Sequence, residues 1–176
     1  AYISGPLAKG LSFRVAGMTA QGGGWQRNVD NGAHLGDANL YALRAKLRWQ
    51  INDRTEVMLS GHYVSDPSQG VAAVPVHRLI GSGALPDVDS KNVQWSFRPE
   101  FAKLIGRSAS MKPGENNQFW GWDLKFSHDF GYAKVTTISA FETERRAELT
   151  DPDGTSLSPA DAWRTAQGDA FPHALR

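Results

Sequence analysis

The sequence contains no cysteine, so it offers neither a disulfide framework nor a thiolate metal site. It also lacks the run of about 20 apolar residues that a membrane-spanning helix needs. Lys and Arg are interspersed with Asp and Glu, and the formal net charge is only +1. A nucleic-acid partner is therefore not expected.

Apolar residues make up 40% of the 176 residues, while 18 glycines and six tryptophans are spread along the chain. Soluble globular domains usually contain somewhat more apolar residues. The composition suits a β-barrel wall with a polar interior and long hydrated loops. Strands can span a membrane without raising the average hydropathy, because their signal is an alternation.

The clearest alternation covers residues 40–49. Arg44, Lys46 and Arg48 fall on one face, and the opposite face carries Tyr41, Leu43, Ala45, Leu47 and Trp49. A period of two predicts a strand with one apolar and one polar face. A helix would scatter the three cations around its axis.

The same pattern predicts strands over 11–17, 55–64, 119–128 and 133–143. The facing of the last strand stays open, because Val135 and Phe141 oppose Ile138. Short turns are expected at Asn52–Arg54 and around Gly131. Loops are expected over 22–37, from Ser65 to about Asn117 and from Arg145 onward.

Three local signals complete this outline. Gly5–Pro6 has turn chemistry. Pro99, followed by apolar residues and Gly106, predicts a short helix. Ser158 as an N-cap with Pro159 at the first helical position predicts a second helix that ends near Gly168.

Short turns thus alternate with long connections along the chain. The expected fold class is all-β: an antiparallel up-and-down meander that is part of a transmembrane β-barrel. Its long loops are expected on the extracellular side and its short turns on the periplasmic side. A soluble β-sandwich gives no reason for this strict alternation.

These segments resemble the early barrel strands of TonB-dependent outer-membrane receptors. The resemblance rests on Gly5–Leu7, Leu11–Gly17, Gly24–Asn28, Leu35–Asp37 and Tyr41–Trp49, and on the hairpin of Asn117–Lys125 with Val135–Glu142. Ser139-Ala140-Phe141 departs mildly from the family's usual strand ending.

The resemblance implies a barrel of about 22 strands with a plug in its lumen. Residues 1–176 would be a partial barrel segment of five to six strands, with the plug domain and the remaining strands outside the chain. Because Ala1 follows neither a signal peptide nor an initiator Met, we expect the true N-terminus upstream. The implied function is import of a scarce nutrient, such as a metal chelate, a cofactor or an oligosaccharide, across the bacterial outer membrane. The implied partners are outer-membrane lipid, the plug and the TonB complex.

The polar side of the strands supplies the candidate site residues, which we expect to face the lumen and to contact plug or substrate. They are Arg14, Arg44, Lys46, Arg48, Asp123 and Lys125. The simpler interpretation is that any barrel wall needs polar residues toward its watery interior. The lipid-facing residues should be Tyr41, Leu43, Leu47, Trp49, Val57, Leu59, Trp120, Trp122, Leu124 and Phe126.

Aromatic residues near the strand ends suit interfacial girdles better than sugar-stacking platforms. Trp25 and Trp95 lie in expected extracellular loops and are candidates for ligand contact. No His pair has metal-ligand spacing, no nucleophile elbow is present, and no cofactor or enzymatic activity is expected.

Two other functions fit the same pattern. A soluble β-sandwich could bind carbohydrate through exposed tryptophans, and a simple porin-like barrel could span the same membrane. The flanking sequence would distinguish these functions.

Overall fold

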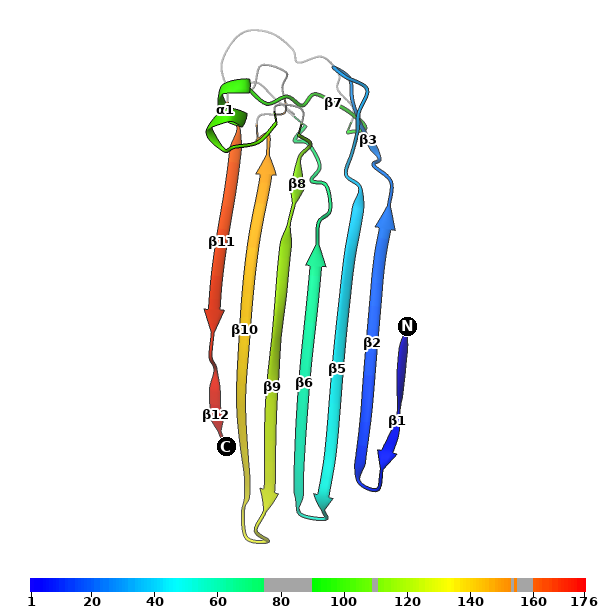
Figure 1. Ribbon diagram of the computed structural model, residues 1–176, viewed down its shortest axis with the longest axis vertical. Helices are drawn as coiled ribbons and strands as arrows, with labels where there is room; N and C mark the ends of the chain where they lie inside the picture. Colours follow the sequence, from blue (N-terminus) through cyan, green and yellow to red (C-terminus); the bar gives the residue numbers. More distant parts are fainter. Residues whose placement is uncertain (75–89, 109–110, 153, 155–159) are drawn as a thin grey trace.

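The computed structural model describes residues 1–74, 90–108, 111–152, 154 and 160–176. Its main feature is a long antiparallel sheet whose strands lie side by side in chain order (Figure 1). The strands are β1 (Tyr2–Ala8), β2 (Leu11–Gly22), β5 (Ala38–Asn52), β6 (Thr55–Asp66), β9 (Asn117–Asp129), β10 (Lys134–Thr150) and β11 (Ala162–Ala170). Two further strands, β8 (Gly114–Glu115) and β12 (His173–Leu175), pair with β10. We call this sheet the wall.

All five expected strands are confirmed, and they pair in the expected order. β2 pairs with β5, β5 with β6, β6 with β9, and β9 with β10. The described strands form an open sheet that begins at β1 and ends at β11, with the two chain termini at opposite edges (Figure 1). The expected antiparallel meander is therefore present.

Tight turns join the strands at one end of the wall. The turn between β9 and β10 uses Gly131 at φ +89°, and Asp129 Oδ1 accepts a 2.7 Å hydrogen bond from the Gly131 N–H. Gly10, at φ +75°, closes the turn between β1 and β2, where a side chain would collide with the Gln50 carbonyl. The long connections gather at the other end of the wall (Figure 1).

Two local predictions near the chain ends are wrong. Gly5–Pro6 lies inside β1, and the turn comes later, at Lys9–Gly10. The helix expected to end near Gly168 is replaced by β11, whose residues 162–170 pair continuously with β10. Cross-strand pairing has overridden the local capping signal there, while Ser158 and Pro159 themselves lie outside the described residues.

The expected loops contain more structure than the sequence indicated. β10 continues as a strand to Thr150, beyond the expected end near Arg145. Three short strands, β3 (Gln26–Asn28), β4 (His34–Leu35) and β7 (Asn92–Val93), form a second sheet. The short helix after Pro99 is confirmed as α1 (Pro99–Leu104).

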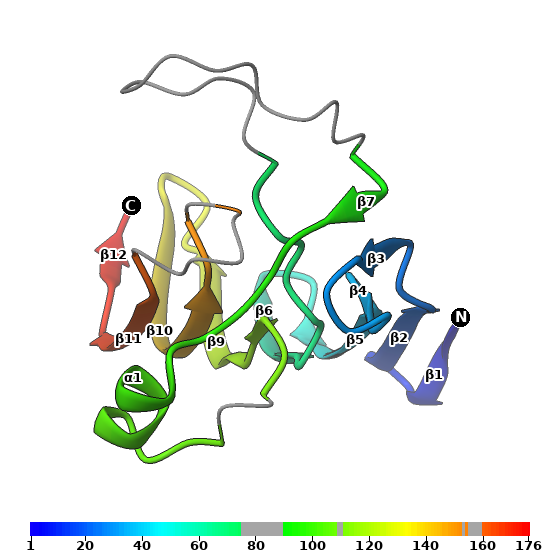
Figure 2. The ribbon, with the colours of Figure 1, turned by 90° about the horizontal axis from the view of Figure 1, so that it is seen from above.

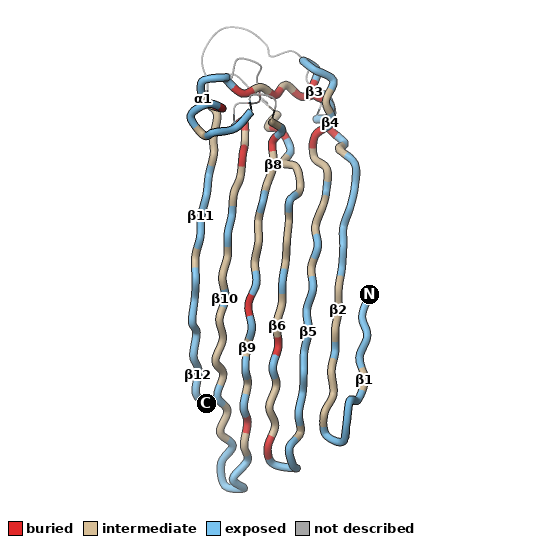
Figure 3. The backbone as a smooth tube through the Cα atoms, in the orientation of Figure 1, coloured by how far each residue is buried: buried red, intermediate tan, exposed pale blue. Residues whose placement is uncertain are grey.

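These pieces form a compact cap over the upper end of the wall (Figure 2). We define the cap as the described residues 23–37, 67–74, 90–108 and 111–113. Its buried cluster consists of Leu35, Ala72, Val93, Trp95 and Phe97, joined by Leu149 of β10. Most buried residues of the chain lie at this end, whereas the wall is largely half-buried or exposed (Figure 3).

Two buried side-chain amides in the connection between β2 and β5 form hydrogen bonds to the connection between β6 and β9. Gln26 Oε1 accepts a 2.8 Å hydrogen bond from the Ala72 N–H, and its Nε2 donates to the Ala72 and Ser90 carbonyls. Asn28 Nδ2 donates a 2.8 Å bond to the Trp95 carbonyl. The cap is therefore a single packed unit in which these buried amides are satisfied.

Candidate functional site

The wall has two chemically different faces, and cross-strand register defines them, because directly paired residues share a face. Leu47 pairs with Leu59, and Leu59 pairs with Leu124. In the same way Leu43 pairs with Tyr63, and Tyr63 with Trp120. One face is thus a continuous apolar surface, which we call the apolar face.

The apolar face is exposed in this chain. Its exposed members include Tyr41, Leu43, Leu47, Trp49, Leu59, Tyr63, Trp120, Trp122, Leu124 and Phe126. The row at its upper border is polar apart from Tyr41, since Tyr41 pairs with Ser65, Ser65 with Gln118, and Gln118 with Arg145. Monomeric soluble proteins rarely expose so extended an apolar surface.

The register also settles the facing of β10, which the sequence left open. Phe141 pairs with Trp122 and lies on the apolar face, where its ring is 5.1 Å from that of Trp120 and 4.7 Å from that of Phe171. Ile138 pairs with Lys125 and lies on the opposite face.

The opposite face, which we call the polar face, carries every candidate lumen residue. Arg14 pairs with Lys46, Lys46 with Ser60, and Ser60 with Asp123. The adjacent rows place Arg44, Arg48 and Lys125 on the same side. The six residues therefore share one face, as expected, while their contact with a plug or a substrate stays a prediction.

Some of these side chains have partners on the same face. Arg48 Nη2 lies 2.6 Å from Glu56 Oε2. Ser60 Oγ donates a 3.3 Å hydrogen bond to Asp123 Oδ1. Within the described residues, Arg44 and Lys46 form no ion pair, and the Arg14 guanidinium lies 4.4 Å from the Tyr2 ring centre.

A contact that spans three strands crosses the middle of the polar face. His62 of β6 pairs with Gly121 of β9, which pairs with Glu142 of β10. Because Gly121 has no side chain, the Glu142 carboxylate crosses β9 and reaches His62, with 3.1 Å between Oε2 and Nε2. A Cβ at position 121 would collide with that carboxylate and with the Phe141 carbonyl.

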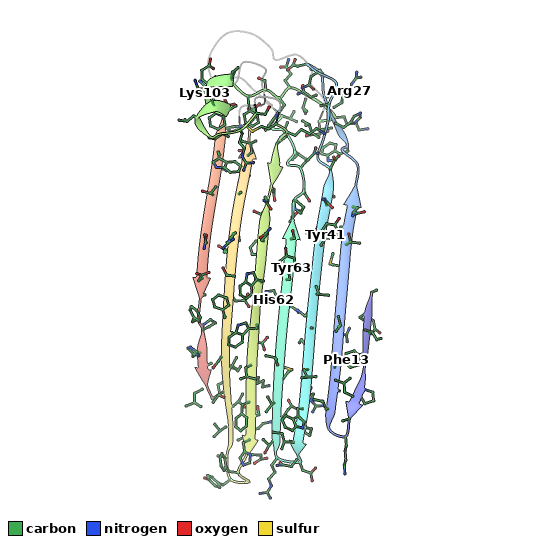
Figure 4. All side chains as sticks on the ribbon, in the orientation of Figure 1. Phe13, Arg27, Tyr41, His62, Tyr63 and Lys103 are labelled. Atoms are coloured by element: carbon green, nitrogen blue, oxygen red, sulfur yellow. The ribbon has the colours of Figure 1, made fainter. Side chains whose placement is uncertain are left out.

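The sequence alone did not identify this contact. The facing of the strand that carries Glu142 had stayed open. A glycine between Trp120 and Trp122 was the only local signal. Figure 4 shows His62 and Tyr63 as neighbours on β6 that belong to opposite faces.

The two halves of the polar face differ in charge. β2 and β5 contribute the cations Arg14, Arg44, Lys46 and Arg48. β10 carries three carboxylates that are paired: Glu142 with His62, Glu144 with Arg146, and Glu148 with Arg164 of β11. The polar face is therefore cationic over β2 and β5, whereas over β10 and β11 positive and negative side chains are paired.

Acidic residues gather at the upper end of the polar face. Burial raises the pKa of Glu115, and the nearby carboxylates of Asp66 and Glu148 raise it further. A 2.8 Å hydrogen bond from Asn117 Nδ2 opposes that shift in pKa. Glu115 also lines an open hollow of about 350 Å³ with Arg146 and Arg164.

The two loop tryptophans occupy different environments. Trp95 is 5% exposed in the cap cluster and meets Phe97 edge to face, with 4.5 Å between ring centres. Trp25 is 53% exposed and lies beside Gly36. Contact of either ring with a ligand stays a prediction.

In the part of the chain that the structure describes, no group of three or more His, Asp or Glu side chains is placed to hold a metal ion. None of the described helices is long and apolar enough to cross a membrane. Comparison with known proteins finds no matching family, no matching curated protein and no matching solved structure.

Proposed function

We propose that this chain forms part of the membrane-spanning wall of a TonB-dependent outer-membrane transporter, which imports a scarce nutrient into a bacterium. The observation that carries the proposal is the two-faced sheet, with an exposed apolar face on one side and a charged face on the other. In a barrel of this kind lipid covers the first face and the watery lumen meets the second.

The height of the apolar face supports a membrane role. Tyr41 and Trp49 lie at opposite ends of the apolar row on β5, which corresponds to about 26 Å along a strand. At a barrel tilt of ~40° this becomes about 20 Å across the membrane, close to the apolar band of ~25 Å in such barrels. Aromatic rings border the face above, at Tyr41, Tyr63 and Trp120, and below, at Trp49 and Phe126.

Turn geometry supports the orientation. Short turns join β5 to β6 and β9 to β10 at one rim, and the long connections form the cap at the other. Outer-membrane barrels have short periplasmic turns and long extracellular loops. We therefore assign the cap to the extracellular side, where it would meet the incoming nutrient.

A porin-like barrel would use the same wall, but the soluble sandwich fits less well. A sandwich covers its apolar face with a second sheet. The second sheet in the described part of this chain is β3, β4 and β7, which belongs to the cap at the end of the wall.

A matched pair of substitutions in β5 tests the proposal in the full-length protein. Leu43→Arg places a cation on the apolar face, where lipid contact should cost about 2–4 kcal/mol. Lys46→Leu removes a cation from the polar face and should leave assembly intact. Barrel assembly is measured in isolated outer membranes as the mobility difference between heated and unheated samples on a gel. Equal tolerance of both substitutions would contradict the membrane assignment.

A further inference from the structure

Three cations lie directly above the apolar face, on the same side of the wall. Arg145 is exposed and belongs to the polar row that borders the apolar face, two positions above Thr143, which pairs with Trp120. Arg107 follows α1, and Lys112 precedes β8. Both are exposed.

A shallow pocket of about 190 Å³ brings two of these cations to the same place on the wall. Arg107 and Lys112 line it together with Ala147 and Trp163. The Arg107 guanidinium carbon lies 5.3 Å from the Trp163 ring centre, which holds the side chain against the wall. Ala147 is two positions beyond Arg145 in the same strand, so Arg145 lies immediately below the pocket on the same face.

The three charges are uncompensated. Across the described ranges of the chain none of them forms an ion pair, in contrast to Arg48, Arg146 and Arg164 on the polar face. Glu115 also contributes to the pocket lining, but it pairs with Glu148, so its carboxylate lies on the polar face, where Asn117 Nδ2 donates to it. The site is therefore cationic at the height where the apolar face ends.

We propose that Arg107, Lys112 and Arg145 bind the phosphate groups of a glycolipid in the outer leaflet of the membrane. The proposal rests on the membrane function proposed above, since it places this row at the level of the lipid headgroups. Arg binds phosphate through two parallel hydrogen bonds, and Lys binds it as a point charge. Asn116, Gln118 and Gln167 offer amides beside the cations, which suits the hydroxyl groups of a sugar headgroup.

A lipid-binding measurement on the full-length protein in neutral detergent tests the site. The probe is lipid A, an acylated disaccharide that carries two phosphates, compared with the same lipid after enzymatic dephosphorylation. The test variant is R107Q/K112Q/R145Q. The control is K9Q/R54Q/K134Q, which removes three exposed cations from the opposite rim and so matches the change in net charge.

The parent protein and the control should bind the phosphorylated lipid more tightly than the dephosphorylated one. The test variant should lose on the order of fivefold in affinity per cation, or roughly 100-fold in total. Inorganic phosphate alone should bind far more weakly than the lipid, because it lacks the acyl chains that the adjacent apolar face would contact.

The possible failures are distinguishable. If the protein assembles as a barrel but binds both lipids equally, or if the control loses as much affinity as the test variant, the glycolipid site is wrong and the membrane function stands. Binding of inorganic phosphate as tight as that of lipid A would also overturn the lipid assignment. If Leu43→Arg is tolerated like Lys46→Leu, both proposals fall together.

Discussion

The wall and the cap are stabilised in opposite ways. The cap buries Leu35, Val93 and Trp95, as a small soluble domain would. The wall instead buries the side chains of Ser60 and Ser127 and exposes the leucines and tryptophans of its apolar face, such as Leu47, Trp49 and Trp120. The cap therefore has an ordinary apolar interior, whereas the wall is held together by its backbone hydrogen bonds and leaves its apolar face uncovered.

The two regions should therefore respond differently to substitution. Removing apolar contacts should damage the cap strongly and locally, because its few buried side chains have no replacement partners. In the wall, changes that disturb strand pairing or place a charge on the apolar face should matter more than truncation of one exposed ring.

The largest effect is expected from Trp95→Ala in the cap. Loss of this buried ring should destabilise the cap by about 3–5 kcal/mol. Trp122→Ala, which truncates an exposed ring of the wall, is the matched control and should leave the cap intact. Limited proteolysis of the folded full-length protein, with cleavage sites mapped by mass spectrometry, measures this.

The comparison predicts a specific pattern of cleavage. Trp95→Ala should expose new sites in the cap while β5, β6, β9 and β10 stay protected. New cleavage within those strands would show that the stability of the wall depends on the cap.

An intermediate effect is expected from Gly121→Ala in the wall. The added methyl group would collide with the Glu142 carboxylate and the Phe141 carbonyl, and crowding of this kind costs about 1–3 kcal/mol. Gly61→Ala is the control, because a Cβ there would meet only the Gly121 carbonyl, at 3.6 Å. Resistance of the folded protein to heat should fall for Gly121→Ala and stay near the parent value for Gly61→Ala.

A further substitution separates crowding from loss of the His62–Glu142 contact. Glu142→Ala removes the contact, and in that background Gly121→Ala should be less harmful because the carboxylate is gone. An unchanged cost would assign the strain to the Phe141 carbonyl alone.

The sequence predicted the wall far better than the cap. Alternation over 40–49 specifies both the strand and its two faces, because a shift of one residue would exchange Arg44, Lys46 and Arg48 with Leu43 and Leu47. The polar face of β2, β5, β6 and β9 followed directly from this period. The exposed apolar face followed from it as well.

The remaining features depend on contacts that no local pattern encodes. β11 forms because residues 162–170 pair with β10, which the helix-like signal at Ser158 and Pro159 does not report. The cap combines segments far apart in the chain, such as Asn28 with Trp95. The contact of His62 with Glu142 required the facing of β10, which became known only from its pairing with β9.

The smallest effect is expected at the junction of the two regions, from Glu115→Gln. The folded protein raises the pKa of Glu115 above its ordinary value of 4.5, so the folded state favours the protonated carboxyl. The associated stability is fully present below pH 4.5 and is lost as the pH rises through the raised pKa. Gln keeps the uncharged form at every pH, so Glu115→Gln should resist unfolding better than the parent protein at pH 7 and equal it near pH 4.

Protease sensitivity of the upper end of β9 and β10, followed from pH 4 to pH 8, measures the difference. An Asp66→Asn background should shrink the gain without abolishing it, since burial is the larger cause of the shift and Asp66 the smaller. A gain of equal size at pH 4 and pH 7 would mean that Glu115→Gln acts through packing, and the junction would then carry no proton-linked stability.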